Sequence, residues 1–231
     1  MTATTQENSG IFITGSDTGV GKTYFSCLLA SELVQRDYRV APRKPAESGC
    51  RLENGQLVPA DALALQRASQ TPEPLDTVCP YRFEAAVSPA SAAAQTGQNL
   101  SLQQLLEACA PADPQAMRLV EGAGGFYSPL AADGLNADLA VALQLPLILV
   151  VADRLGCINH CLLSLEAIAH RGLHTVAIIL NQTETEASAS SDNLQAIRAL
   201  TDIPVFYLAQ GQNRIDPELF DYLPIPTQDQ P

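Results

Sequence analysis

Residues 11–23 constrain the fold more than any other part of the chain. Four apolar or β-branched residues, 11–14, lead into a glycine-rich turn that ends in Gly21, Lys22 and Thr23. Glycines let successive backbone N–H groups converge on phosphate oxygens, and the helix that follows adds its positive N-terminal end. In this arrangement Lys22 reaches the terminal phosphates of a nucleotide, and the Thr23 hydroxyl binds the accompanying Mg²⁺. The segment therefore predicts a strand, a phosphate-binding loop and a helix.

The spacing of this loop differs from the usual one. Five residues separate Gly15 from the Gly-Lys pair at 21–22, where four are usual, and Ser16 stands where the usual spacing has glycine. A plain strand-to-helix turn is the alternative interpretation. It does not account for Gly-Lys-Thr between a buried strand and an amphipathic helix start, so we predict nucleotide binding.

Short apolar segments alternate with helical patterns along the rest of the chain. This alternation is typical of a single-domain α/β fold, with a mostly parallel β-sheet and helices on both faces. Ligands of such sheets bind beyond the carboxyl ends of the strands. Strands are predicted at residues 11–14, 39–41, 118–120, 145–151, 175–180 and 204–208. Helices are predicted at residues 23–35, 61–68, 102–109, 136–143, 158–170 and 191–200.

Length and composition favour one domain in the cytoplasm. A chain of 231 residues with 46% apolar side chains can bury one sizeable core. We predict that domain at 11–223, after a flexible start at 1–10 and before a loose tail at 224–231. The net charge of −12 argues against nucleic-acid and membrane partners. No signal peptide, membrane-spanning segment or close metal-binding pair among the six cysteines is predicted.

Charged side chains follow two of the predicted strands. Lys44 comes after the second strand and Glu121 ends the third. A solvated lysine and a capped turn are the ordinary alternatives, but the position at strand ends favours a ligand-binding role. Asp61 can equally cap the helix that it begins. Together Thr23, Asp61 and Glu121 supply a suitable protein share of the oxygen ligands of Mg²⁺.

Two further segments have open interpretations. Residues 156–160 lie between a strand and a helix, so their N–H groups form a second possible anion site. A simple helix start, with Cys157 and Cys161 packed one turn apart, is an equal alternative. Asn181 ends a strand and can either read a base edge or cap a turn.

Five blocks, in order and over nearly the whole chain, resemble the dethiobiotin synthetase family. The blocks are GSDTGVGKT at 15–23, KPAESG at 44–49, DALALQ at 61–66, EGAGG at 121–125 and LGCINH at 155–160. The resemblance implies a P-loop fold and an ATP-dependent cyclo-ligase of biotin biosynthesis. Such an enzyme joins CO₂ to 7,8-diaminopelargonic acid through a carbamate and a carbamic-phosphoric anhydride. The products are dethiobiotin, with its ureido ring, ADP and phosphate.

The same resemblance implies roles for individual residues. It makes Lys22 and Lys44 catalytic and places Mg²⁺ on Thr23, Asp61 and Glu121. It also implies a homodimer in which the helix start of one subunit holds the substrate carboxylate in the site of the other. The implied substrate-binding residues are Thr18, Ser48, Gly156, Cys157, Ile158 and Asn159. The implied nucleotide-binding residues are Gly19, Val20, Gly21, Lys22, Thr23, Tyr24, Asp61, Glu121, Gly122, Ala123, Gly124, Asn181 and Gln210.

The chain departs from the family pattern at three positions. Gly19 stands where some members carry Glu, Arg154 where some carry Lys, and Ala90 where some relatives have a polar residue. The main rival is a P-loop ATPase switch of the partition or metal-centre-maturation type. Such switches typically carry an extra lysine early in the loop, where this chain has Ser-Asp-Thr at 16–18. An amidating ligase would ordinarily need a glutaminase domain, for which the chain has little room.

Overall fold

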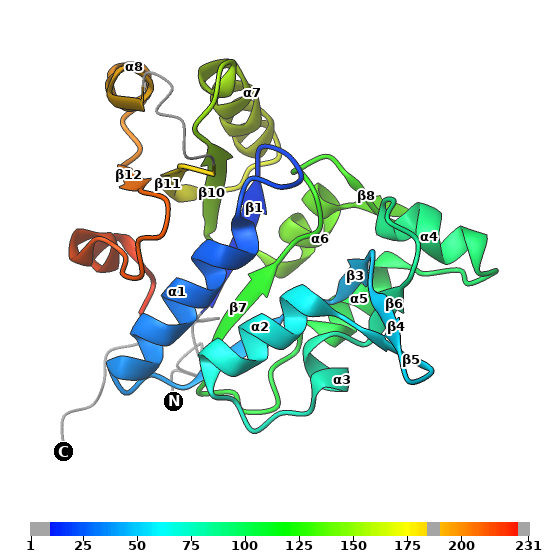
Figure 1. Cartoon of the computed structure of the whole chain (residues 1–231). Coiled ribbons are helices and arrows are strands. Elements are labelled where there is room, and N and C mark those ends of the chain that lie inside the picture. The colour runs from blue at the N-terminus through cyan, green and yellow to red at the C-terminus, as the bar shows by residue number, and fades with distance from the viewer. Residues whose placement is uncertain (1–9, 184–189, 226–231) are drawn as a thin grey trace, which may run out of the picture.

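The computed structural model describes residues 10–183 and 190–225, which build a layered α/β structure (Figure 1). Its centre is a six-stranded sheet in the order β12-β11-β10-β1-β7-β2, in which all neighbouring strands are parallel. This confirms the predicted fold class and all six predicted strands. The strands are β1 (Gly10–Gly15), β2 (Val40–Arg43), β7 (Met117–Glu121), β10 (Leu147–Ala152), β11 (Thr175–Asn181) and β12 (Val205–Leu208).

Helices cover both faces of the sheet because the strands are apolar on both sides. Successive side chains of a strand point to opposite faces. In β1, Ile11 and Ile13 join one core cluster and Phe12 joins the other. The first cluster includes side chains of α1 (Lys22–Gln35), α2 (Ala60–Ser69) and the 3₁₀ helix η1 (Pro217–Tyr222). The second includes side chains of α4 (Pro89–Gln95), α5 (Leu102–Ala108), α6 (Asn136–Leu143), α7 (Cys157–His170) and α8 (Ser190–Leu200).

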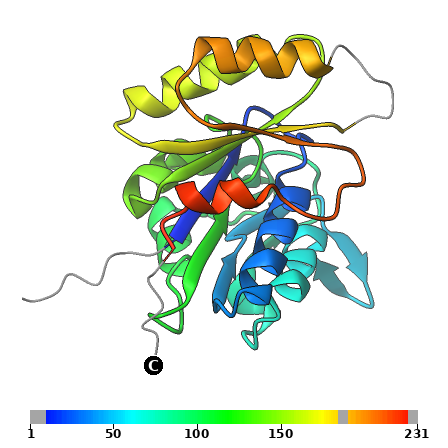
Figure 2. The ribbon, with the colours of Figure 1, turned by 90° about the vertical axis from the view of Figure 1, so that its left-hand side faces the viewer.

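Figure 2 shows the two layers from the side, with α7 and α8 on one side of the sheet and η1 and α1 on the other. Small elements that the sequence did not predict complete the fold. Besides α4 and η1, these elements are the pairs β3 (Ala46–Ser48) with β6 (Tyr81–Phe83), β4 (Arg51–Glu53) with β5 (Gln56–Val58), β8 (Pro129–Ala131) with β9 (Gly134–Leu135), and α3 (Leu75–Val78).

Three neighbouring strands place the predicted chemistry at one edge of the sheet. In the order β1-β7-β2, the strands end at Gly15, Glu121 and Arg43, which are followed by the phosphate loop, the 122–125 segment and Lys44. Because these strands are parallel, their carboxyl ends face the same side. The fold therefore brings together groups that lie up to 100 residues apart.

Two predictions about the ends of the chain fall mostly outside what the structure describes. Of the predicted flexible start, 1–10, only Gly10 is described, and of the predicted tail, 224–231, only Pro224 and Ile225 are described. Within 10–183 and 190–225, no helix combines the length and the apolar character needed to cross a bilayer.

Candidate active site

The phosphate loop is held open by glycines in the left-handed backbone region. Gly19 has φ 73° and Gly21 has φ 88°, and Gly21 occupies the N-cap position of α1. No described side chain caps this helix, so its first N–H groups remain available to an anion. A Cβ atom at Gly21 would lie 2.0 Å from Nδ2 of Asn181. Only glycine therefore lets the loop pack against the end of β11.

Lys22 folds back over this loop. Its Nζ donates a hydrogen bond to the Asp17 carbonyl oxygen at 3.0 Å, and the residue is only 6% exposed. Burial, reinforced by the nearby Lys44 ammonium, lowers the pKa of Lys22 to about 8. The charged form of Lys22 is thus poorly stabilised, and an anion bound in the loop would supply the compensating charge.

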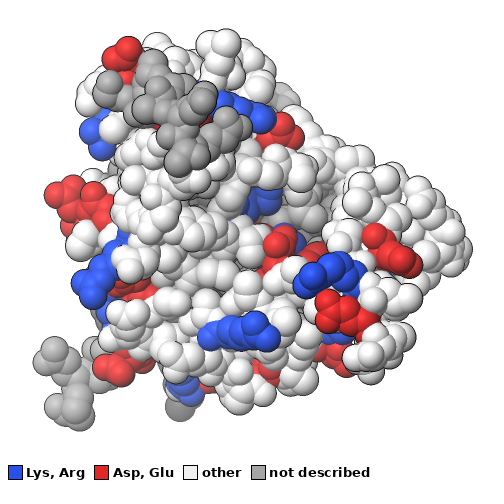
Figure 3. All heavy atoms as spheres, in the orientation of Figure 1, with Lys and Arg blue, Asp and Glu red and all other residues white. Residues whose placement is uncertain are grey.

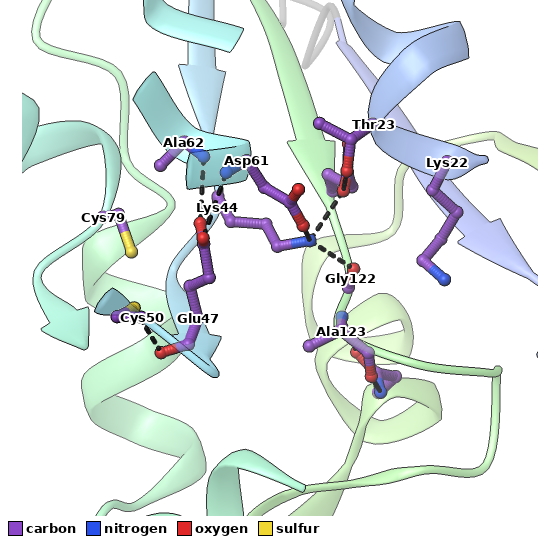
Figure 4. A network of polar contacts seen from close by, with 12 residues as sticks. Lys22, Thr23, Lys44, Glu47, Cys50, Asp61, Ala62, Cys79, Gly122 and Ala123 are labelled. Carbon is purple, nitrogen blue, oxygen red and sulfur yellow. Dashed lines mark hydrogen bonds and ion pairs between the residues drawn. The ribbon is translucent and has the colours of Figure 1, made fainter. Parts of the chain in front are cut away.

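Lys44 lies between two carboxylates (Figure 4). Its Nζ lies 2.6 Å from Oε1 of Glu121 and 3.1 Å from Oδ2 of Asp61, and it also donates to the Gly122 carbonyl at 3.3 Å. Burial alone would lower the pKa of Lys44, but Glu121 and Asp61 outweigh it and hold that pKa above its ordinary value. Lys44 is therefore a fixed cation, unlike Lys22.

Thr23 and Glu121 have the donor set that a Mg²⁺ ion needs. Thr23 Oγ1 donates to Glu121 Oε1 at 2.7 Å, whereas the buried Oε2 of Glu121 has no hydrogen-bond partner among the described residues. The described residues contain no group of three or more His, Cys, Asp or Glu suited to a metal. Mg²⁺ commonly takes one or two carboxylates together with water and phosphate oxygens. Thr23, Asp61 and Glu121 therefore fit this ion when a nucleotide supplies the other ligands.

A cavity of about 340 Å³ opens between the phosphate loop and the start of α2. Figure 3 shows this face hollowed near its centre, with both basic and acidic atoms in the hollow. All of the lining residues except Glu47 belong to the predicted site. The phosphate loop and the start of α1 contribute Thr18, Gly19, Gly21, Lys22 and Thr23, and the other blocks contribute Lys44, Ser48, Asp61, Ala123 and Gly124.

Comparisons with known proteins test the predicted family. The AAA domain family profile matches residues 9–209. An ATP-dependent dethiobiotin synthetase of Ruthia magnifica is 40% identical over 196 residues, which cover 85% of this chain and 89% of that protein. Its counterpart in Anaeromyxobacter sp. is 43% identical over 182 residues, covering 78% and 80% of the two chains. The chain belongs to the dethiobiotin synthetase family.

This membership confirms the predicted family, and with it an ATP-dependent ligase of the P-loop class. Among solved structures, the signal recognition particle receptor FtsY of Elizabethkingia anophelis has a TM-score of 0.50 at 15% identity. The match covers 94% of this chain and 66% of that one. At so low an identity the likeness concerns the fold alone.

The loop that carries the dethiobiotin synthetase block at 121–125 is locked by Asn136, which the sequence did not single out. The buried Asn136 donates through Nδ2 to the carbonyl oxygens of Ala123, Gly125 and Ser128 at 2.6, 3.2 and 3.2 Å. Its Oδ1 accepts the Ala123 N–H at 3.0 Å. The only sequence signal was its place at the start of a predicted helix, which carries no information about the loop.

Several family-implied residues lie at or near the loop without lining the cavity. The Asn181 side chain is buried and donates to the Val20 carbonyl at 2.9 Å, so it braces the phosphate loop. Tyr24 donates from its hydroxyl to the Gln212 carbonyl. The backbone N–H of the exposed Gln210 donates to Gln182 Oε1 at 3.3 Å. Gly122 accepts from Lys44.

The predicted second anion site lies apart from the cavity. Gly156 has φ 89° and is the N-cap of α7, with Cys157 buried and Asn159 exposed. None of the residues 156–159 lines the cavity described above. An ion pair of 3.1 Å between Arg154 and Asp17 links this turn to the phosphate loop. Within one chain, therefore, the turn is a neighbour of the loop and not a wall of the site.

Proposed function

We propose that this member of the family is an ATP-dependent cyclo-ligase that forms the ureido ring of dethiobiotin. One amine of 7,8-diaminopelargonic acid takes up CO₂ to give a carbamate. A carbamate oxygen then attacks the γ-phosphorus of ATP and ADP leaves, which gives a carbamic-phosphoric anhydride. The second amine attacks the carbamoyl carbon, phosphate leaves and the ring closes.

The observation that supports this reaction best is the convergence of two buried lysines, whose pKa values are shifted in opposite directions, on one cavity. Lys22 belongs to the phosphate loop and Lys44 to the neighbouring wall, and both line the same space of about 340 Å³. A phosphate-binding loop alone suits any nucleotide-binding protein. A second buried ammonium facing the same space suits a reaction in which an anionic acceptor meets the terminal phosphate.

Lys44 is suited to stabilise charge and not to move protons. Because Glu121 and Asp61 hold the pKa of Lys44 above its ordinary value, Lys44 is an ammonium at neutral pH. Three acceptors already hold its N–H groups, so Lys44 would act on the negative charge of the carbamate and phosphate oxygens through its fixed positive charge. Lys22 serves the phosphates of the nucleotide from the opposite side.

Bound Mg²⁺ would neutralise charge on the phosphate oxygens, and Thr23, Asp61 and Glu121 would hold it. On the diamine side, Thr18 and Ser48 line the cavity and have hydroxyl groups that can orient an amine or a carbamate. The diamine must react as a neutral amine, so the protein's task is to position it beside the phosphate loop. Gly19, Val20, Gly21, Tyr24, Gly122, Ala123, Gly124, Asn181 and Gln210 complete the proposed nucleotide site.

We further propose a homodimer with shared sites. In this arrangement the N-terminus of α7, residues 156–159, binds the carboxylate of a diamine held in the partner's cavity. Gly156 leaves the first N–H groups of α7 without a described side-chain cap, which suits an anion. The separation of this turn from the cavity of its own chain also supports a role across a dimer.

Phosphate release that depends on the diamine tests the reaction. Purified protein with Mg²⁺-ATP and bicarbonate should release one phosphate for each dethiobiotin formed. ATP turnover that is indifferent to the diamine would refute the proposal. Lys44→Ala should lower turnover far more than nucleotide binding, and a variant with a normal rate would remove Lys44 from the mechanism.

Mixing two inactive variants tests the shared sites. Lys22→Ala removes a phosphate contact, and Asn159→Glu places a negative charge at the start of α7. A heterodimer has one intact site if the sites are shared, so an equimolar mixture should recover about a quarter of the wild-type activity. No recovery in a mixture that has been shown to exchange subunits would contradict this geometry.

A further inference from the structure

Glu47 is a buried carboxylate that the proposed reaction leaves without a role. It lies in β3, is only 6% exposed and is the one cavity-lining residue that the sequence did not predict. Burial, together with the nearby Asp61 carboxylate, raises the pKa of Glu47. The ionised form of this side chain is therefore less stable here than in water.

Both oxygens of Glu47 are used by the first turn of α2. Oε1 accepts the Asp61 N–H at 3.0 Å and Oε2 accepts the Ala62 N–H at 2.9 Å (Figure 4). These are the second and third residues of α2, whose N–H groups are those that an N-cap side chain normally satisfies. The N-cap position itself is Pro59, which has no side-chain acceptor. Glu47 therefore caps this helix from a separate strand, 14 residues before Asp61 in the chain.

The cap fixes the backbone of Asp61, whose side chain contacts Lys44. Asp61, held by its N–H on Glu47, reaches Lys44 Nζ at 3.1 Å with its own carboxylate. Lys44 is anchored in turn, because its backbone N–H donates to the Val78 carbonyl at 2.8 Å. Glu47 and Lys44 are three residues apart on one short segment. This segment therefore positions the Lys44 ammonium and, through Glu47, the backbone of Asp61, whose carboxylate pairs with Lys44.

We propose that Glu47 is a positioning residue that sets the Asp61 carboxylate for binding the Mg²⁺ of the nucleotide. The inference rests on the proposed nucleotide site. Glu47 acts through two backbone hydrogen bonds and touches neither metal nor nucleotide. Residues that orient a metal ligand typically change metal affinity 10- to 100-fold when they are lost, which gives the scale of the expected effect.

The test measures how much Mg²⁺ improves ADP binding. Calorimetric titrations of each variant give the dissociation constant of ADP without Mg²⁺ and with Mg²⁺. The first divided by the second is the ratio compared among variants, and a larger ratio means that Mg²⁺ improves ADP binding more. Glu47→Gln keeps the size of the side chain and one acceptor oxygen, but turns an amide NH₂ group toward the other N–H. We expect it to lower the ratio about tenfold. Glu47→Asp, which keeps the charge but withdraws it by one methylene, serves the same purpose if Glu47→Gln is too unstable.

Two comparisons separate positioning from a merely structural cap. In an Asp61→Asn background Glu47→Gln should have no further effect on the ratio, because its route to the metal is already lost. Ser101→Ala removes the N-cap of α5, where Ser101 Oγ accepts the Gln104 N–H at 3.3 Å on the surface. It should lower the melting temperature and leave the ratio unchanged.

A wild-type ratio in Glu47→Gln, or an undiminished effect of this change in the Asp61→Asn background, would overturn the inference. So would a wild-type protein in which Mg²⁺ does not alter ADP affinity. The titrations contain no diamine. A protein that binds Mg²⁺-ADP but never turns over the diamine would refute the proposed reaction, and the ratios would still decide the role of Glu47.

Discussion

Replacing Lys44 by methionine should destabilise the protein through the carboxylates it leaves behind. The Glu121 side chain is fully buried, whereas the Asp61 side chain is 44% exposed, so water compensates Asp61 but not Glu121. Removing one partner of a buried ion pair costs about 3–5 kcal/mol. Because Thr23 still donates to Glu121 in the variant, we expect the lower end, about 3 kcal/mol. For a chain of this size, this corresponds to a fall in melting temperature of about 6–12 °C.

Urea unfolding of wild type and Lys44→Met measures this loss, with equal slopes as the sign that the unfolded state is unchanged. Adding Glu121→Gln to Lys44→Met should recover most of the stability, since the uncompensated charge is then gone. Mg²⁺ should also recover part of it, because the cation replaces the missing ammonium between the carboxylates. A loss below about 1 kcal/mol, or an equal loss when Glu121→Gln is present, would refute this reasoning.

Two further predictions concern Lys22 and Asn136. Because the pKa of Lys22 is about 8 in the folded protein and its ordinary value is 10.5, the unfolded chain binds more protons between these values. The stability of wild type relative to Lys22→Met should therefore rise from pH 8 to pH 10.5, by up to about 3 kcal/mol, in urea unfolding; parallel pH curves would count against it. Asn136→Asp replaces a donor to three carbonyls by a carboxylate, and should cost at least about 2 kcal/mol and weaken ADP binding. The exposed Asn99→Asp adds the same charge and should do neither, and equal effects of the two changes would show that charge alone is responsible.

The main sheet and its helices were predictable because their signals are local. Each central strand is a short apolar run, and the helices with a clear periodicity of their own were found, so all six predicted strands and all six predicted helices are present. Helix α4, as long as α5, was missed. The short pairs such as β3 with β6 were missed, since three residues give no periodicity and their pairing depends on the surrounding fold. The convergence of Lys22, Lys44 and Glu121 followed from the rule that parallel strands present their carboxyl ends together. Asp61 lies in the first turn of a helix, and it was joined to this group through the expected Mg²⁺ ligands and the family resemblance.

The supporting residues of the site were less predictable because they act over long distances in sequence. Glu47 caps a helix that begins 13 residues later, and no local pattern marks a cap of this kind. Asn136 belongs to α6 but holds the 122–128 segment. Asn181 was expected either to read a base edge or to cap a turn, and its hydrogen bond from the amide to the Val20 carbonyl was not predicted. A sequence position shows which strand end a residue occupies, but not which neighbour its side chain chooses.

The strand order β1-β7-β2 also fixes the distance between the backbones of the phosphate loop and of Lys44. The phosphate loop and Lys44 leave strands on either side of β7, so two interstrand spacings, roughly 10 Å, separate their backbones. Hydrogen bonds along three strands fix this length, and side-chain changes in the cavity cannot alter it. The side chains of Lys22 and Lys44 must therefore reach across this fixed spacing to meet in one cavity. Shortening or bulging β7 would change which pairs of reacting groups fit, even with every cavity side chain unchanged.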